Sequence, residues 1–376
     1  MPFYYTLRTD FLRTEQRNYV AKKLIKLKGQ LEAEVPCKDA EHHLLLETWN
    51  IRDFGKKNRR GYGNRTKDSL YYIAEIISSF DLVAVQEVNE LNEWRKVMSI
   101  LGPNWDFIAT DVADDKAGGN GERMLFVYDK RKVLFRNVAG EIVLPTDMLI
   151  TEATNTGNLD KLFSGKQFRR TPFVVTFQSD WFKFDLCTVH IYFGADSSEE
   201  LQQRIQEIDR IAKYLSKRAD NALNKQSNAT ILLGDFNIKN PEHETMKALF
   251  NNGFTVPKNI QSKKTNVIET MHYDQIAFKS DEEIISFIDT ESNDPKTANS
   301  GVVKVLKSVF QDTEEDYNYY EPEVSKSSAG NINKFNNKGG KRAYYAKEWR
   351  TYQMSDHNLM WVRIKTNDSV KYLTNL

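Results

Sequence analysis

The chain has 376 residues, of which 40% are hydrophobic and 12% aromatic, enough to bury one large core or two modest ones. Its 53 basic and 52 acidic residues leave a formal net charge of +1, so no global field holds a polyanion and any phosphate binding must be local. The sequence contains no long uncharged apolar run, and Met1–Arg8 lacks the organisation of a secretory signal. We therefore expect a soluble monomer without a membrane partner. Two cysteines, Cys37 and Cys187, are too few for a disulfide framework and favour a cytoplasmic over a secreted location.

Residues 1–42 are predicted to form a helical extension in front of the main domain. Apolar side chains recur near helical spacing between Gln16 and Glu34, at Val20, Leu24, Ile25, Leu27 and Leu31. Charged residues separate them, so the helix is amphipathic and we expect it to pack on that domain.

Residues 43–366 are predicted to form one large domain of alternating strands and helices. It starts with a strand at His43–Ile51, a helix at Ser69–Phe80 and a second strand at Asp81–Val88. Further strands are predicted at Met124–Tyr128, Lys132–Val143, Pro172–Phe177, Phe182–Phe193, Ala229–Asp235, Tyr273–Phe278 and Asn358–Ile364. Turns alone separate several of these strands, so antiparallel pairing must be substantial. An apolar stripe between Ser198 and Arg218 predicts a surface helix that faces the core, and we assign it no chemistry.

Two segments interrupt this pattern, Thr151–Phe168 and about 291–350, where Asn, Ser, Lys, Gly and Tyr dominate. We interpret both as loops or insertions. Within the second, Ser325–Arg342 has almost no aliphatic residues, so mobility is the expectation and a lid that contacts substrate is the alternative. Residues 367–376 are interpreted as a C-terminal tail.

Carboxylates and carboxamides follow the apolar runs of several predicted strands. Asn50 ends the first strand, Glu87 ends the second, and Asp235 and Asn237 end another in Gly-Asp-Phe-Asn. An α/β sheet can gather distant residues at such ends, and hard oxygen ligands suit Mg²⁺ or Mn²⁺. We interpret Glu87 as the best metal ligand because its carboxylate follows an apolar run; a solvated strand end is the alternative. Asp235 and Asn237 face the same side of an extended chain, where they could orient a water molecule or close the strand with an Asx turn.

Two histidines have candidate carboxylate partners. His190 interrupts an apolar strand, where a lone histidine is more often a core residue, and His357 follows Asp356 in Ser-Asp-His, a weak signal by itself. Glu122 and Asp274 each stand at the head of a strand-like run. A carboxylate behind an imidazole fixes its tautomer and raises its pKa. The sequence therefore permits two carboxylate–histidine pairs.

Several cations could hold a phosphate group. Arg170 precedes Thr-Pro-Phe, and its planar fork can bind two phosphate oxygens, although an ordinary surface arginine is the alternative. A basic cluster begins at Arg52 and continues through the loop Lys56–Lys67. Its position beside Asn50 favours contact with a nucleic-acid backbone over a solvated flexible loop. We assign Asn50 and Arg52 to phosphate binding.

A series of short motifs follows one another along the chain. They are Asn-Ile-Arg-Asp-Phe-Gly at 50–55, Gln-Glu-Val at 86–88, Glu-Arg at 122–123, Arg-Thr-Pro at 170–172, His190, Gly-Asp-Phe-Asn at 234–237, Tyr-Asp at 273–274 and Ser-Asp-His at 355–357. In this order they resemble the motifs of the endonuclease/exonuclease/phosphatase superfamily, and its deoxyribonuclease I branch is the most similar. The resemblance spans roughly residues 43 to 365.

The resemblance implies a four-layer α/β sandwich, with two packed mixed, largely antiparallel sheets flanked by helices. It also implies a Mg²⁺-dependent nuclease that hydrolyses phosphodiester bonds of DNA or RNA. Position by position, Glu87 would bind Mg²⁺ with help from Asn50 and Asp356, while Asn237 and Arg170 would contact the scissile phosphate. Glu122 would orient His190 and Asp274 would orient His357. The two histidines would carry out general acid–base work, and Asp235 would help to activate or place the water.

Some residues depart from the deoxyribonuclease branch. Gln275 and Asn89 stand where that branch tends to have arginines, and Asn120 and Gly121 replace bulkier residues that contact the DNA groove. The usual contacts to double-stranded DNA are therefore not carried over. Two alternatives remain: a phosphoesterase of the same fold that acts on inositol phosphates or sphingomyelin, and a non-catalytic nucleic-acid-binding or scaffold protein.

Overall fold

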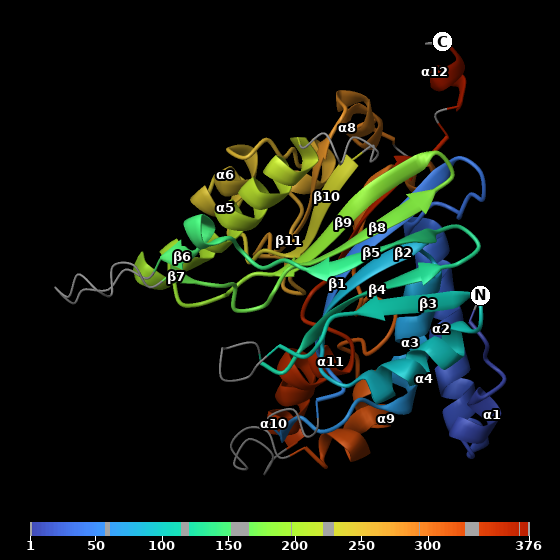
Figure 1. Cartoon of the computed structure of the whole chain (residues 1–376). Coiled ribbons are helices and arrows are strands. Elements are labelled where there is room, and N and C mark those ends of the chain that lie inside the picture. The colour runs from blue at the N-terminus through green and yellow to red at the C-terminus, as the bar shows by residue number, and fades with distance from the viewer. Residues whose placement is uncertain are drawn as a thin grey trace.

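The computed structural model of the chain describes residues 2–56, 61–113, 120–151, 165–196, 198–220, 229–292, 294–327, 338–367 and 369–374. Two mixed sheets pack against each other, and helices cover their outer sides (Figure 1). This architecture confirms the predicted α/β sandwich.

The strands come from most of the chain length. They are β1 (His43–Phe54), β2 (Leu82–Val88), β3 (Trp105–Ala109), β4 (Arg123–Asp129), β5 (Leu134–Glu141), β6 (Ile150–Thr151), β7 (Gly165–Lys166), β8 (Phe173–Ser179), β9 (Phe182–His190), β10 (Ala229–Asp235), β11 (Asp274–Ser280), β12 (Ser300–Val303) and β13 (Leu359–Lys365). The helices are α1 (Leu7–Asp10), α2 (Thr14–Glu34), α3 (Lys67–Ser78), α4 (Leu91–Leu101), α5 (Ser198–Asp220), α6 (Glu244–Phe250), α7 (Lys258–Gln261), α8 (Glu282–Ile288), α9 (Glu314–Val324), α10 (Lys338–Tyr344), α11 (Arg350–Gln353) and α12 (Ser369–Thr374).

One sheet has six strands in the order β12-β13-β1-β2-β4-β3, and the other has five in the order β11-β10-β9-β8-β5. Among the described strands, β1 pairs in parallel with β2 and β9 with β10, and the other pairs are antiparallel. The expected predominance of antiparallel pairing is confirmed. Each parallel pair needs a crossover connection, and the helices α3 and α5 lie in these two connections. Helix α5 therefore starts shortly after the polar end of β9.

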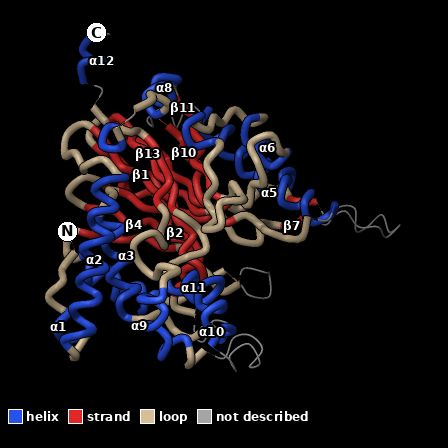
Figure 2. The backbone as a smooth tube through the Cα atoms, turned by 180° about the vertical axis from the view of Figure 1, so that it is seen from behind, coloured by secondary structure: helices blue, strands red, loops and turns tan. Residues whose placement is uncertain are grey.

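The alternation along β1 shows how the layers are held together. Leu44 and Leu46 belong to an apolar cluster between the two sheets, whereas Leu45 and Trp49 belong to a second cluster under the helices α2–α4. Successive side chains of a strand point to opposite faces, so a strand buried on both faces links two cores. Each fully buried leucine contributes about 1.5–3 kcal/mol. In Figure 2, seen from the opposite side to Figure 1, α2 and α3 lie at one side of the strands and α5 and α6 at the other.

The N-terminal helix α2 packs on the second cluster, as expected. Its residues Val20, Leu24, Leu27 and Leu31 are buried, but Ile25 is 71% exposed. The inclusion of Ile25 in the predicted stripe was wrong. One residue is about 100° of rotation in a helix, so Ile25 points away from the face that its neighbour Leu24 buries.

The loop alternative for residues 291–350 was wrong for much of the described part of this segment, whereas its interpretation as an insertion stays a prediction. This segment contains the edge strand β12, the helices α9 and α10, a π-helical turn at Tyr345–Trp349 and the start of α11. Aromatic side chains hold it on the second cluster, among them Phe310, Tyr317 and Tyr320. The segment has few aliphatic residues, but aromatic rings bury as much apolar area or more.

Parts of the two interrupting segments lie outside the described residues, at 152–164 and 328–337. Most residues of Ser325–Arg342 are among these, so the expected mobility of this stretch stays a prediction. At the ends of the first segment, Ile150 and Thr151 pair with Lys166 and Gly165. None of the helices formed by described residues combines the length and the apolar character that a bilayer crossing requires.

Candidate active site

Three polar residues of the five-stranded sheet lie side by side at one end of it. Asp235 of β10 pairs with His190 of β9 on one side and with Asp274 of β11 on the other. The preceding residue, Gly234, has a φ of +135°, and a Cβ atom there would come within 2.1 Å of the carbonyl oxygen of Val189. A side chain at this position would push β10 away from β9, so glycine is required for the close approach.

The six-stranded sheet supplies Asn50 of β1 and Glu87 of β2. Four residues around the site have a left-handed backbone: Arg52, Asp53, Glu87 and Asn237, with φ angles of 53°, 48°, 64° and 53°. Such conformations cost about 1–3 kcal/mol each and persist where surrounding bonds fix them. Here the backbone N–H of Asp53 donates to Glu87 Oε2 at 2.8 Å, and that of Asn237 donates to Asp235 Oδ1 at 3.0 Å. The Asx-type contact considered as an alternative for Asp235 and Asn237 is therefore present.

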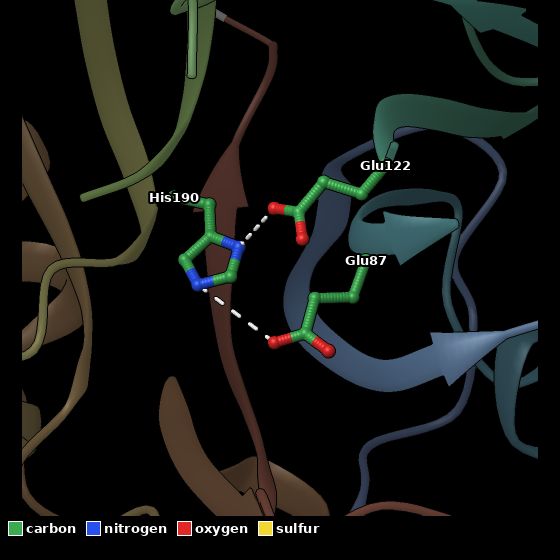
Figure 3. Close-up of side chains that lie close together, drawn as sticks. All are labelled: Glu87, Glu122 and His190. Carbon is green, nitrogen blue, oxygen red and sulfur yellow. Dashed lines mark hydrogen bonds and ion pairs between the residues drawn. The ribbon is translucent and has the colours of Figure 1, made fainter. Parts of the chain in front are cut away.

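The first carboxylate–histidine pair joins the two sheets. Glu122, directly before β4, has its Oε1 2.5 Å from His190 Nδ1. The other ring nitrogen, Nε2, lies 3.7 Å from Glu87 Oε1, so the imidazole has one carboxylate at each nitrogen (Figure 3). Arg170 Nε also lies 2.5 Å from Glu122 Oε1. Glu122 thus holds a histidine and an arginine at once.

The second pair also joins the two sheets, but here the carboxylate belongs to the five-stranded sheet and the histidine to the six-stranded sheet. His357, shortly before β13, has its Nδ1 2.8 Å from Oδ2 of Asp274. The Ser355 hydroxyl donates to the Asn50 carbonyl oxygen at 2.5 Å and accepts from the His357 backbone N–H at 2.8 Å. The ring of Tyr273 packs against the imidazole at 5.5 Å between centroids. These contacts tie the Ser-Asp-His turn to β1.

The Nε2 atoms of both imidazoles point toward the same oxygen atom. His190 Nε2 lies 3.6 Å from Asp235 Oδ2, and His357 Nε2 lies 3.7 Å from it. The Asn50 amide nitrogen donates to this oxygen at 3.0 Å and to Glu87 Oε1 at 2.9 Å. Asp235, 2% exposed, is therefore the centre of the site.

The charges around Asp235 favour a carboxylate between two protonated histidines. Burial raises the pKa of Asp235, but His357 and His190 outweigh it and the net shift is downward. Burial and Arg170 lower the pKa of His190, whereas Glu122 and Asp235 outweigh them and raise it. For His357, Asp274 and Asp235 overcome the effect of burial and hold the pKa well above its ordinary value.

Glu87 is the carboxylate that best fits a divalent cation. Burial raises its pKa, His190 opposes this shift, and the negative charges of Glu122, Asp53 and Asp356 raise the pKa further, so that the net shift is upward. A site with this excess of buried carboxylates is relieved by a divalent cation with oxygen ligands. Ligand atoms of Glu87, Glu122 and His190 all lie within 4.8 Å of one another, as do those of the group Asp235, Asp274 and His357.

The other two residues expected to help with the metal are arranged differently. Asn50 directs its amide nitrogen, not its oxygen, at Glu87 and Asp235, while its oxygen accepts the Arg52 N–H at 3.0 Å. In this arrangement Asn50 orients the carboxylates. Asp356 is 3.3 Å from Arg52 Nη1 and forms an ion pair with it.

The cations predicted to bind phosphate separate into two groups. Arg170 and Arg52 lie at the site, and the Arg52 guanidinium also stacks on Tyr352 at 3.7 Å. In the basic loop, Arg65 instead donates to main-chain carbonyl oxygens, including those of Arg52 and Gln353 at 2.7 and 2.6 Å. Lys56 donates to the Asn120 side chain at 2.7 Å. Residues 57–60 of this loop lie outside the description.

Two functional candidates on α5 escaped the sequence reasoning. Arg204 and Glu207, each 1% exposed, contact the main chain directly after His190. Asn237, which was predicted to contact phosphate, donates its amide to the Ile191 carbonyl oxygen at 2.8 Å and ties the same loop. A charged residue on the buried face of a predicted helix would have been the signal for both.

No protein-family model matches the sequence, and no curated protein matches it either. Solved structures do match. An endonuclease/exonuclease/phosphatase family protein from Leptotrichia buccalis is 12% identical, with 85% of this chain and 99% of that chain covered and a TM-score of 0.46. The human Nocturnin catalytic domain is 13% identical over 86% and 95% of the two chains, with a TM-score of 0.46. A mannosyl-6-phosphatase from Bacteroides thetaiotaomicron is 18% identical over 63% and 85%, with a TM-score of 0.46.

The name of the first of these proteins is that of the superfamily that the sequence motifs resemble. None of the three names specifies the deoxyribonuclease I branch, which stays a prediction. Similarity at this level of identity concerns the general fold. The function has to be argued from the side chains of this chain.

Proposed function

We propose that this protein is a metal-dependent phosphodiesterase and that its substrate is a nucleic acid. One observation carries the proposal: two carboxylate-oriented histidines converge on one oxygen of Asp235, within reach of the acidic residue Glu87. Phosphodiester hydrolysis requires a base for water, an acid for the leaving oxygen and positive charge for the phosphate. The site offers a group for each task.

In the proposed mechanism, Asp235 accepts a proton from the attacking water. Its lowered pKa keeps it ionised, and Asn50 and the backbone N–H of Asn237 hold its two oxygens in place. The neighbouring carboxylates raise the pKa values of both histidines, which favours the protonated rings as N–H donors to the non-bridging and departing oxygens. Glu122 and Asp274 position the two rings through Nδ1.

Glu87 would hold the divalent cation, with Asp356 and Asn50 available after small rearrangements of their side chains. Bound Mg²⁺ or Mn²⁺ supplies charge neutralisation at the phosphate oxygens. Arg170 and Arg52 each form an ion pair with a carboxylate of the site, Glu122 and Asp356 respectively, and each could contact a phosphate oxygen. Two arginines beside the centre fit a diester within a polyanionic chain, and this arrangement supports nucleic acid as the substrate class.

The proposal is tested by incubating the purified protein with circular plasmid, linear DNA, single-stranded DNA and RNA, with Mg²⁺ and with EDTA. Inositol phosphates and sphingomyelin complete the panel. We expect cleavage of a nucleic acid that EDTA abolishes, and a fall in kcat of at least about 10²-fold in Asp235→Asn. Lys247→Met is a suitable control, since Lys247 is an exposed residue that pairs with Glu244 away from the site.

A thermal-shift measurement separates metal binding from catalysis. Mg²⁺ that binds the folded state raises the unfolding temperature. We expect this shift in the wild-type protein and in Asp235→Asn, and a much smaller shift in Glu87→Gln. Absence of nucleic-acid cleavage by the wild-type protein, with hydrolysis of another phosphoester instead, would reassign the substrate. Absence of any hydrolysis would contradict the proposal as a whole.

A further inference from the structure

The loop that follows His190 is held by buried charges of helix α5. Arg204 donates to the carbonyl oxygens of Phe193 and Gly194, the latter at 3.1 Å, and to that of Asn237 at 3.2 Å. Glu207, three residues after Arg204 in the helix, accepts the backbone N–H of Tyr192 at 3.0 Å. Residues three apart lie on the same face of a helix, so one face of α5 binds both the donors and the acceptors of this loop.

Burying the charges of Arg204 and Glu207 costs free energy, and most of their hydrogen bonds are to this loop and to Asn237. Burial lowers the pKa of Arg204 and raises the pKa of Glu207, which shows the desolvation that both groups undergo. This cost in free energy is offset where the two charges hold the loop in one conformation. Because Arg204 also binds the Asn237 carbonyl oxygen, the loop is fixed relative to the Gly-Asp-Phe-Asn motif.

This rigid loop displays an aromatic side chain next to the site. Phe193 is 53% exposed, and its ring packs edge-on against Tyr273 at 6.1 Å and 88°. Tyr273 in turn packs on the imidazole of His357. The Arg204 guanidinium lies 5.2 Å from the Phe193 ring centroid on the protein side. The ring is therefore fixed by its neighbours and still has half of its surface open to solvent.

We propose that Phe193 is a substrate-binding residue that stacks on the nucleobase next to the scissile phosphate, and that Arg204 and Glu207 position it. This inference rests on the proposed function and deepens it, because it assigns the substrate class by its base as well as by its phosphate. An aromatic face recognises any base without reading its edge. Stacking on Phe193 therefore predicts that the protein prefers unstacked, single-stranded nucleotides and tolerates any base sequence.

If the proposal is correct, the protein must cleave a substrate that carries a base next to the scissile phosphate with a higher kcat/KM than one that lacks this base. The substrates are single-stranded oligonucleotides, in DNA and RNA form, with one cleavable phosphodiester among neutral methylphosphonate links. The residue on the 5′ side, the residue on the 3′ side or neither carries an abasic tetrahydrofuran in place of its base. Stacking on one aromatic ring corresponds to about 5- to 150-fold in binding. We expect wild-type kcat/KM to fall by this factor when the base is missing on one of the two sides.

Variants of Phe193 show whether this ring is the source. Phe193→Leu should cleave the substrates with and without the base within about 3-fold of each other, since leucine keeps apolar bulk and loses the π-face. Phe193→Tyr should retain the discrimination. Trp181→Ala is the matched control: Trp181 is 52% exposed, similar to Phe193, and lies at the other end of β9. It should leave the discrimination unchanged.

Arg204→Lys tests the positioning role. Lysine keeps the charge and loses the fork that reaches several carbonyl oxygens, so KM for base-containing substrates should rise more than kcat falls. Equal cleavage of base-containing and base-free substrates by the wild-type protein, or discrimination that persists in Phe193→Leu, would overturn the inference and leave the proposed function standing. Failure of the wild-type protein to cleave these oligonucleotides while it cleaves plasmid or linear DNA would overturn the inference alone, and failure to cleave any nucleic acid would overturn both.

Discussion

The two carboxylate–histidine pairs of the site share a plan and differ in their surroundings. Glu122 is shared between His190 and Arg170. Asp274 serves His357, and its second oxygen, Oδ1, has no hydrogen-bond partner among the described residues. Burial raises the pKa of both carboxyls, but His190 and Arg170 outweigh it at Glu122, whose pKa is lowered, while burial prevails at Asp274, whose pKa is raised.

This difference suggests that the two pairs have different roles in the proposed reaction. The first pair belongs to an array of charges that includes Arg170, the arginine that we propose contacts the phosphate. The second pair is more isolated, and its histidine is held protonated more strongly. We therefore expect the first pair to affect both substrate binding and the rate, and the second to affect the rate and its pH dependence.

Glu122→Gln should have the largest effect. The substitution removes the charge that orients His190 and the anchor of Arg170, so we expect kcat to fall by about 10²–10⁴-fold. KM should rise as well, because the guanidinium is released. Steady-state kinetics on one oligonucleotide substrate measure both quantities. An unchanged KM would separate Arg170 from phosphate binding.

Asp274→Asn should have a smaller effect on the same assay. Only the orientation and protonation of His357 change, so we expect kcat to fall by about 10- to 100-fold with KM nearly constant. The comparison breaks down if this variant is as impaired as Glu122→Gln in both parameters.

The pH profile of the Asp274→Asn variant sharpens the comparison further. The Asp274 and Asp235 charges outweigh burial and raise the pKa of His357, so the protonated ring persists to higher pH than an ordinary histidine. Loss of the Asp274 charge lowers that pKa. If protonated His357 is required, the alkaline limb of kcat moves to lower pH. An alkaline limb at the wild-type position would show that His357 is not the acid.

The smallest effect concerns stability, where the loss of Glu122 should cost more than the loss of Asp274. A lowered folded-state pKa at Glu122 stabilises the protein above the unfolded value of about 4.3, and this contribution is lost as the pH falls. Glu122→Gln should therefore lower the unfolding temperature at neutral pH and do so less in acid. At Asp274 two effects oppose each other: burial raises its own pKa, so its ionisation costs stability above about pH 3.9, while its charge raises the pKa of His357 and stabilises the protonated ring. Asp274→Asn should therefore change the unfolding temperature at neutral pH less than Glu122→Gln does, and a larger decrease would contradict this assignment.

The positions of Glu87 and Asp235 near strand ends could be predicted from the sequence, because a polar residue after an apolar run is a local signal. The prediction that Asn50 ends the first strand was wrong, since β1 continues to Phe54 through an irregularity after Asn50. The partners of the histidines could be named only with the help of the motif resemblance. His190 and Glu122 are 68 residues apart, and His357 and Asp274 are 83 apart. Contacts across such separations depend on the packing of the two sheets.

Other features were missed for physical reasons that can be stated. The segment 291–350 has few aliphatic residues, and it is buried by some of these, such as Val305 and Val309, together with the rings of Phe310 and Tyr320. On α5, the apolar stripe was correctly interpreted as a core face, and the same interpretation hid Arg204 and Glu207 among the surface charges. Their position on the apolar face of the helix was the available signal, but the loop that they bind could not be identified from the helix pattern.

Each carboxylate–histidine pair has one member on each sheet. A small slide of one layer over the other would lengthen both pairs together and move both rings away from Asp235. The rate of the proposed reaction would then depend on the register between the two layers. Heat or denaturant should therefore abolish the proposed activity as soon as the layers separate, while each sheet still keeps its own strands paired.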